Sequence, residues 1–276
     1  MRIRTTSTQR TYRYVRLAII GATVFLAIGV GVELVTRGPL PSVSAAYYTP
    51  AGPVFVGALS AIALALLALS GRSLEQGLLD VGAVLALVVA FVPTTVTGER
   101  CGGPPRCVPP EVRATVLANG VAVASVVLLG VVAAVILARV QGTLSRGVVV
   151  TTAVIGLLVV GGVGWAVAAP SAFLAAAHEI AAVAFFVIIA AVAGLAAWRP
   201  QPAGRRSPRV RAAYAVVAAA IAATLVLLVL GVATGVDRTG FPAVLVGEAV
   251  ALLLFSVFWI VQTVELWNEA DPTLRG

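Results

Sequence analysis

The sequence has little charge, no lysine and a single histidine. Only 11% of its 276 residues are charged, whereas 60% are hydrophobic and the mean hydropathy is +1.05. A soluble chain of this length could not hide so much apolar surface from water, and a disordered chain carries far less of it. The alternating strands of about ten residues that build an outer-membrane barrel are also missing. The composition therefore indicates a polytopic helical membrane protein.

All 19 basic residues are arginine. Together with the frequent alanine, valine and glycine, this is typical of a GC-rich genome, and an actinobacterial source is expected. The net charge of +8 suits a protein that faces anionic lipid head groups on the cytoplasmic side of a membrane. No basic stripe with interleaved aromatic residues is present, so no nucleic-acid partner is expected.

Apolar runs that could cross a bilayer occur eight times along the chain. A spanning helix needs about 20 such residues, and the second run is short. The first run follows a basic segment but exceeds the apolar stretch of a secretory signal peptide, so a retained anchor helix is expected. The expected spans cover residues 16–36, 53–70, 75–93, 114–138, 147–169, 171–198, 211–233 and 243–264.

The arginine positions indicate an orientation. Fourteen of the 19 arginines fall on the inner side if the N-terminus is cytoplasmic, and the positive-inside rule then places both termini in the cytoplasm. We therefore expect an all-α bundle of about eight spans in a bacterial inner (plasma) membrane. A basic tail over 1–15 precedes one transmembrane helical domain over 16–267, and a second cytoplasmic tail covers 268–276.

The two cysteines lie close together, in the segment CGGPPRC that includes Cys101 and Cys107. The expected orientation places this connection outside the cytoplasm, where a structural disulfide is favoured. Closing so short a loop contributes about 2 kcal/mol. Two thiols without neighbouring histidine or carboxylate ligands make a poor metal site, and their spacing is not that of a C-x-x-C redox pair. No metal ion and no cofactor are expected.

Few ionisable residues fall inside the expected spans, where each costs about 2.5–3.5 kcal/mol to insert. Glu33, His178, Glu179 and Glu248 come from three different spans and lie in their outer halves, whereas Asp80 enters from the cytoplasmic side. Ionisable groups at such depth tend to face a cavity or a partner. One interpretation is a single outward-facing polar pocket built by the first four residues, with His178 and Glu248 as its best candidates.

The first loop could cover such a pocket, since it supplies Tyr47, Tyr48 and Thr49. The alternative is that each ionisable group is satisfied separately, for example Glu33 by Arg37 one helical turn away. His178 and Glu179 are neighbours whose side chains point about 100° apart on a helix, so only one of them aims comfortably at a given centre.

Several segments resemble a poorly characterised bacterial multi-pass membrane family. Its members typically read SIS-x-YYYT followed by vFVG, similar to PLPSVSAAYYTPAGPVFVG at 39–57 here. Similar marks follow at VVAFVPTT (88–95), HEIAAVAFF (178–186) and GEAVALLLFSVFW (247–259). The layout also resembles, more distantly, the Frag/DRAM/Sfk-type membrane proteins.

This chain departs from the family pattern in two extra spans over about 114–169 and in one tyrosine fewer. The resemblance implies an eight-span variant of the same helical architecture. It points to Tyr47, Tyr48, Thr49, His178 and Glu248 as site residues and assigns no reaction.

Three classes of function stay open. The few polar groups favour a non-enzymatic protein that binds a lipid or a small apolar ligand, or that assists an envelope system. A proton-coupled secondary transporter would use Glu248, Asp80 and His178 as a relay. A membrane-embedded lipid hydrolase or transferase would need Ser42 or Ser44 as nucleophile, because the single histidine excludes His-rich zinc and paired-histidine haem sites. Membrane lipids are the expected partners, and a protein partner or a homo-oligomer stays open.

Overall fold

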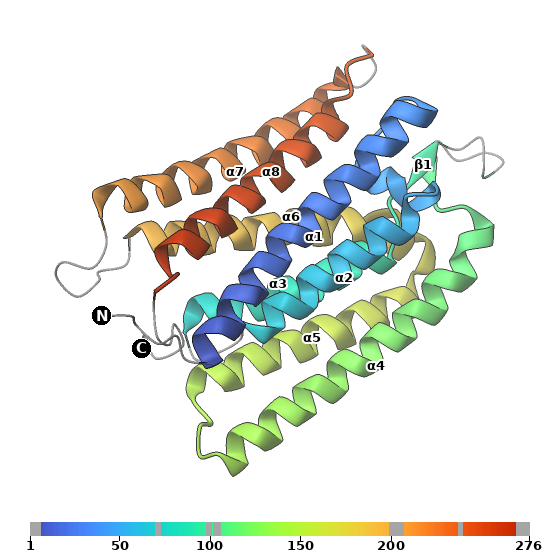
Figure 1. Ribbon diagram of the computed structural model, residues 1–276. Helices are drawn as coiled ribbons and strands as arrows, with labels where there is room; N and C mark the ends of the chain where they lie inside the picture. The colour runs from blue at the N-terminus through green and yellow to red at the C-terminus, as the bar shows by residue number, and fades with distance from the viewer. Residues whose placement is uncertain are drawn as a thin grey trace.

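The chain is almost entirely helical in a computed structural model that describes residues 7–69, 73–97, 101, 106–198, 207–236 and 240–268. Within these residues, eight α-helices run up and down in succession (Figure 1). They are α1 (Ser7–Arg37), α2 (Gly52–Ala68), α3 (Leu74–Phe91), α4 (Pro110–Val140), α5 (Arg146–Ala168), α6 (Pro170–Trp198), α7 (Pro208–Thr234) and α8 (Ala243–Glu265).

Seven of these helices are long and apolar enough to cross a membrane, and α2 is a shorter apolar helix of 17 residues. All eight expected segments are helical, which confirms the all-helical, multi-pass character of the chain. Helix α1 begins at Ser7, before the start of the expected apolar span at residue 16. Helical hydrogen bonds lie within the backbone, so a helix extends beyond its apolar stretch. The remainder of the expected tails, 1–6 and 269–276, lies outside the described residues.

Local sequence signals define several helix ends. Ser73 and Gln76 form a capping box at the start of α3. The backbone N–H of Gln76 donates to Ser73 Oγ, and the backbone N–H of Ser73 donates to Gln76 Oε1. Ser145 and Ser207 accept a backbone amide bond at the starts of α5 and α7. Gly235 ends α7 in the left-handed conformation with φ 72°. These contacts satisfy backbone groups that a helix end otherwise leaves without partners.

Six helices close into a bundle that we call the six-helix ring. Helix α1 packs on α2, α2 on α3, α3 on α6, α6 on α7, α7 on α8, and α8 returns to α1. The main apolar core fills this ring and includes the fully buried side chains of Ile62, Ile189, Ile221 and Phe255.

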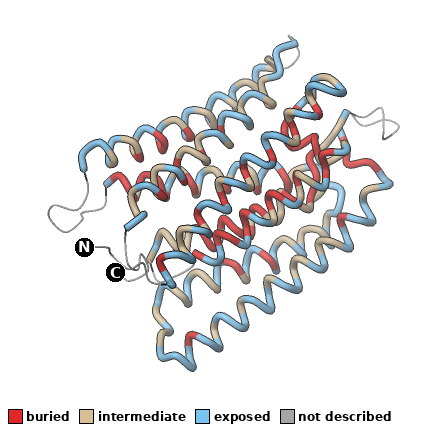
Figure 2. The backbone as a smooth tube through the Cα atoms, viewed as in Figure 1, coloured by how far each residue is buried: buried red, intermediate tan, exposed pale blue. Residues whose placement is uncertain are grey.

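The other two helices, α4 and α5, form a peripheral hairpin outside the ring. Helix α5 packs on α3 and α6, and α4 packs on α5 and on α3. Only 6% of the most apolar stretch of α4 and 11% of that of α5 is buried, against 44% in both α3 and α6. Figure 2 shows the same contrast, with α4 mostly exposed and the buried residues gathered in the ring.

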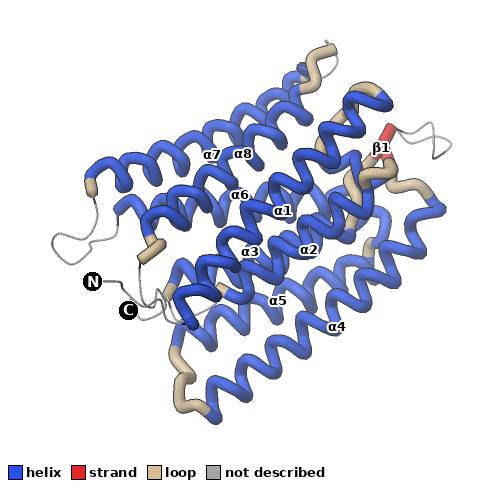
Figure 3. The backbone as a smooth tube through the Cα atoms, viewed as in Figure 1, coloured by secondary structure: helices blue, strands red, loops and turns tan. Residues whose placement is uncertain are grey.

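The two ends of the bundle differ. At the end where α1 begins and α8 stops, Arg13 donates from Nε to the Trp267 carbonyl over 2.6 Å, and its guanidinium lies 4.7 Å from the centre of the Trp267 ring. We call this the terminal end. The opposite end, the loop end, carries a short 3₁₀ helix, η1 (Ser44–Tyr48), and a two-stranded antiparallel ribbon of β1 (Val96–Thr97) and β2 (Arg106–Cys107) (Figure 3). This ribbon is the one described departure from the all-helical prediction.

Candidate ligand-binding site

Helix η1 is fixed to several elements at the loop end. It packs directly on the start of α2, because Gly52 allows the two backbones to approach closely. A Cβ atom at Gly52 would lie 2.6 Å from the Tyr47 carbonyl oxygen, too close for any other residue without a shift. Thr49 completes the turn between η1 and α2, since its hydroxyl donates to the Ala46 carbonyl and accepts from the Ala51 amide.

The carboxylate of Glu248 joins η1 to α8. Its Oε2 accepts a 3.0 Å hydrogen bond from the Ser44 amide, and its Oε1 accepts a 3.0 Å bond from the Ser44 hydroxyl. Both oxygens are therefore held by one residue that lies 204 positions away in sequence. This two-point contact couples the position of η1 to that of α8.

A second set of contacts holds the extended segment that follows α3. The Thr94 hydroxyl donates to Glu179 Oε1 over 2.8 Å, and the Tyr48 hydroxyl donates to the Thr94 carbonyl over 2.7 Å. His178 Nδ1 lies 2.6 Å from the Val92 carbonyl oxygen. The neighbours His178 and Glu179 thus contact two different residues of one segment, as their divergent directions on α6 require.

His178 is only 2% exposed, and its Nε2 has no hydrogen-bond partner in the part of the chain that the structure describes. A carbonyl oxygen only accepts hydrogen bonds, so the contact with Val92 assigns the ring proton to Nδ1. Nε2 is then a buried acceptor. It lies one helical turn from Ala182 on the same face of α6.

A cavity of about 60 Å³ lies directly below these contacts, inside the six-helix ring. Its wall is apolar except for Ser44 and Glu248. The side chains come from α1, η1, α2, α3, α6 and α8, namely Leu26, Val43, Ser44, Phe55, Leu59, Ala86, Val89, Ala182, Phe185, Phe186, Glu248 and Leu252. The cavity is therefore almost wholly hydrocarbon-like, and the contact between Ser44 and Glu248 lies beside it.

Asp80, which the sequence places on the cytoplasmic side, lies outside this wall, and so do the other residues predicted for the site, namely Glu33, Tyr47, Tyr48, Thr49, His178 and Glu179. Glu33 is buried on α1 and forms an ion pair with Arg37, with 3.5 Å between Oε1 and Nε. Tyr47 packs edge-on against Tyr48 with 5.3 Å between ring centres, and burial raises the pKa of its hydroxyl above the ordinary value. Asp80 is buried on α3, toward the terminal end. The structure thus brings Glu248, Glu179, His178 and Tyr48 together and separates Glu33 and Asp80 from them.

Ser44 and Thr94 are the hydrogen-bond partners of Glu248 and Glu179, and a search for ionisable residues alone does not find them. The sequence offers Ser44 only as a possible nucleophile, and Thr94 stands in the VPTT segment that supports the family resemblance. Thr94 directly follows an expected span, whereas Ser44 lies in the middle of the first loop and carries no positional signal.

The serines do not face the histidine. Ser44 donates to Glu248, Ser42 accepts from the Ala45 amide, and His178 contacts Val92. Across the described ranges, no hydrogen bond links either serine to His178, and no group of three or more His, Cys, Asp or Glu side chains could hold a metal ion. The arrangement is that of an apolar cavity with a hydrogen-bonded Ser44–Glu248 pair beside it.

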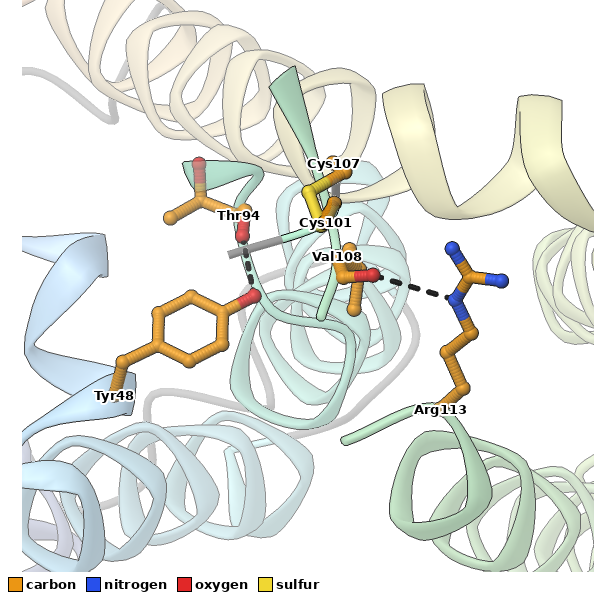
Figure 4. The surroundings of a disulfide bond; sticks show 6 residues. All are labelled: Tyr48, Thr94, Cys101, Cys107, Val108 and Arg113. Carbon is orange, nitrogen blue, oxygen red and sulfur yellow. Dashed lines mark hydrogen bonds between the residues drawn. A yellow bond between two sulfur atoms is a disulfide. The ribbon is translucent and has the colours of Figure 1, made fainter. Parts of the chain in front are cut away.

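The ribbon beside Tyr48 and Thr94 carries the disulfide (Figure 4). Cys101 and Cys107 are bonded, with their Cα atoms 6.4 Å apart, and residues 102–105 of the CGGPPRC segment lie outside the described residues. Cys107 pairs with Val96 in the ribbon, two residues after Thr94. Arg113 Nε donates to the Val108 carbonyl over 3.3 Å and ties the start of α4 to the same region.

Comparison with protein-family models, with curated protein sequences and with solved structures gives no match. The function must therefore be argued from the geometry of the site.

Proposed function

We propose that this protein binds a small apolar ligand, or one end of a lipid chain, in the cavity of the six-helix ring. The observation that carries the proposal is the cavity itself, whose lining is almost wholly apolar and includes the residue Glu248. Burying a carboxylate beside hydrocarbon raises the free energy of the folded state unless hydrogen bonds or charges offset its desolvation. Apolar side chains and few, well-placed polar groups are typical of small-molecule sites.

Helix η1 serves as the cover of this site. It contributes Val43 at its N-cap and Ser44 to the cavity wall, and the Ser44–Glu248 and Tyr48–Thr94 contacts hold it in place. Breaking these contacts would open the chamber at the loop end of the ring. Because hydrogen bonds of this kind each contribute about 0.5–1.5 kcal/mol, such a cover can open without unfolding the bundle.

We further propose that the protein lies in a bacterial inner membrane with the terminal end in the cytoplasm and the cavity toward the outer side. The arginine distribution supports this orientation, and so does the disulfide at the loop end, since disulfides persist outside the reducing cytoplasm. We also propose that the chain is related to the bacterial multi-pass family that its loop motif resembles.

Native mass spectrometry with lipid extraction tests the binding function. Ala182→Phe places a ring in the cavity, whereas Ala191→Phe makes the same change at an exposed position on the opposite face of α6. We expect wild type and Ala191→Phe to retain one defined small molecule or lipid and Ala182→Phe to lose it. Equal, unselective lipid in all three proteins would contradict the proposal.

Impermeant maleimide labelling of intact cells tests the orientation. The native cysteines are in a disulfide, so a single introduced cysteine reports its own side of the membrane. Glu111→Cys, at the start of α4, is expected to react from outside, and Ser7→Cys, at the start of α1, only after the cells are opened. The reverse pattern would overturn the proposed orientation.

A further inference from the structure

Hydrogen-bond acceptors gather beside the apolar cavity, and of their residues only Glu248 is part of its wall. Glu248 already accepts two bonds from Ser44, and an ionised carboxylate has about four acceptor positions and no donor. Among the described residues His178 Nε2 has no hydrogen-bond partner, and His178 lies one turn from the cavity residue Ala182 without itself lining the cavity. Glu179 accepts from Thr94 and lies close enough to act electrostatically on both Glu248 and His178.

Two of the cationic side chains near this end are engaged elsewhere, and Arg106 lies exposed on β2. Arg37 pairs with Glu33, and Arg113 donates to the Val108 carbonyl. In the part of the chain that the structure describes, neither Glu248 nor Glu179 has a salt-bridge partner, and their donors are the neutral groups of Ser44 and Thr94. The two carboxyl groups beside the cavity therefore lack a salt-bridged cation among the described residues.

We propose, resting on the function proposed above, that the ligand is a cationic amphiphile whose ammonium head binds Glu248 while its hydrocarbon part fills the cavity. An ammonium group has three donors and no acceptor, so it complements this acceptor-rich end. It replaces the Ser44 hydroxyl and amide on the carboxylate, and this exchange releases η1 as the ligand enters. An anionic head would meet the carboxylates of Glu248 and Glu179 at close range and be repelled.

The size of the cavity limits what it holds. One water-sized atom needs about 10–15 Å³ measured in this way, so about 60 Å³ takes roughly four to six non-hydrogen atoms. The closed site thus accommodates the head and first carbons of a chain. Phe185 and Leu252 in the wall then contact hydrocarbon and leave no polar group unsatisfied.

Three probes with one chain and different heads test this inference: octylamine, octanol and octanoate. Saturable binding is measured at pH 7.4 to wild type in phosphatidylcholine nanodiscs, with empty nanodiscs subtracted. We expect octylamine to bind at least about tenfold more tightly than octanol, and octanoate to bind most weakly. Octanol or octanoate binding as tightly as octylamine would overturn the inference.

Substitutions locate the head group. Glu248→Gln is expected to reduce octylamine binding to the level of octanol, and Glu179→Gln to weaken it about twofold to fivefold. Glu33→Gln is the matched control, because Glu33 is also buried near this end but pairs with Arg37 outside the cavity wall. Unchanged octylamine binding in Glu248→Gln would overturn the inference. If that variant does not fold, the ranking of the three heads on wild type still decides.

The outcomes separate the two proposals. One outcome is that wild type binds all three probes equally and that Ala182→Phe abolishes this binding. It would overturn the ammonium inference and support the cavity as an apolar site. If none of the probes binds saturably while wild type retains a selective natural ligand, the ammonium inference fails and the binding function stands. Absence of both would contradict both proposals.

Discussion

The six-helix ring and the peripheral hairpin place their apolar surfaces in opposite surroundings. Helix α4 contains the most apolar stretch of the seven long helices and buries 6% of it, whereas α3 contains the least apolar stretch and buries 44%. In a soluble protein the order would be reversed, because water drives the most apolar segment inside. Lipid removes that driving force, so packing and polar contacts select which helices form the interior.

Polar contacts follow the same division. The bonds of Glu248, Glu179 and His178 all lie within the ring, as does the cavity. The hairpin glycines Gly130, Gly156 and Gly161 have open space where a side chain would be, whereas Gly52 and Gly29 in the ring face close neighbours. Close packing at a glycine therefore occurs at particular positions of the ring, since Gly21, Gly31 and Gly57 of the ring also face open space.

Removing a buried leucine from the ring should cost far more than removing one from the hairpin. Leu66 on α2 is 0% exposed and Leu129 on α4 is 69% exposed. Leu66→Ala is expected to lower the free energy of unfolding by about 2–5 kcal/mol because it leaves a cavity, and Leu129→Ala by less than about 0.5 kcal/mol. Denaturant titration in bicelles measures both, and equal effects would refute the distinction between the regions.

A methyl group added to a glycine should have the next largest effect. Gly52→Ala places Cβ against the Tyr47 carbonyl, so we expect it to destabilise the protein by about 1–3 kcal/mol. Gly130→Ala meets no atom within 4 Å and should be neutral or slightly stabilising. Thermal unfolding of the two variants provides the test, and a neutral Gly52→Ala would mean that η1 does not press on α2.

The contact between Ser44 and Glu248 should produce the smallest effect on stability and the clearest local one. Ser44→Ala removes the hydroxyl donor and keeps the amide, at an expected cost of about 0.5–1.5 kcal/mol. Hydrogen exchange should quicken at 44–48 and stay unchanged in α4. Ser125→Ala, an exposed change on α4, is the control. Unaltered exchange at 44–48 would show that Glu248 does not hold the cover.

Hydropathy predicts the fold well, because bilayer thickness sets the length of the apolar runs. All eight helices occur where the runs predict them, and the largest boundary difference is at α1, where polar residues from Ser7 onward continue the helix. What hydropathy does not encode is which helices pack together. The extra spans over about 114–169 become the peripheral hairpin, and that placement depends on contacts between distant residues.

The candidate site is only partly accessible from the sequence. The positions of Glu248, Glu179 and His178 along their expected spans predict that they lie at one end of the bundle. In the structure all three lie at the loop end. Depth also places Glu33 at that end, but its neighbour Arg37 supplies a partner on the same helix. The partners Ser44 and Thr94 follow from how η1 and the segment after α3 fold, which no helical period describes.

Photolabelling tests most directly the claim that the ligand enters the ring. A photoreactive eight-carbon amine is crosslinked to wild type in nanodiscs, and the modified residues are located by peptide mass spectrometry. We predict saturable labelling in the cavity wall, at Leu59, Phe186 and Leu252, with unlabelled octylamine competing for it. Labelling confined to the lipid-facing surface of α4 and α5, or equal labelling that octylamine does not reduce, would contradict the account.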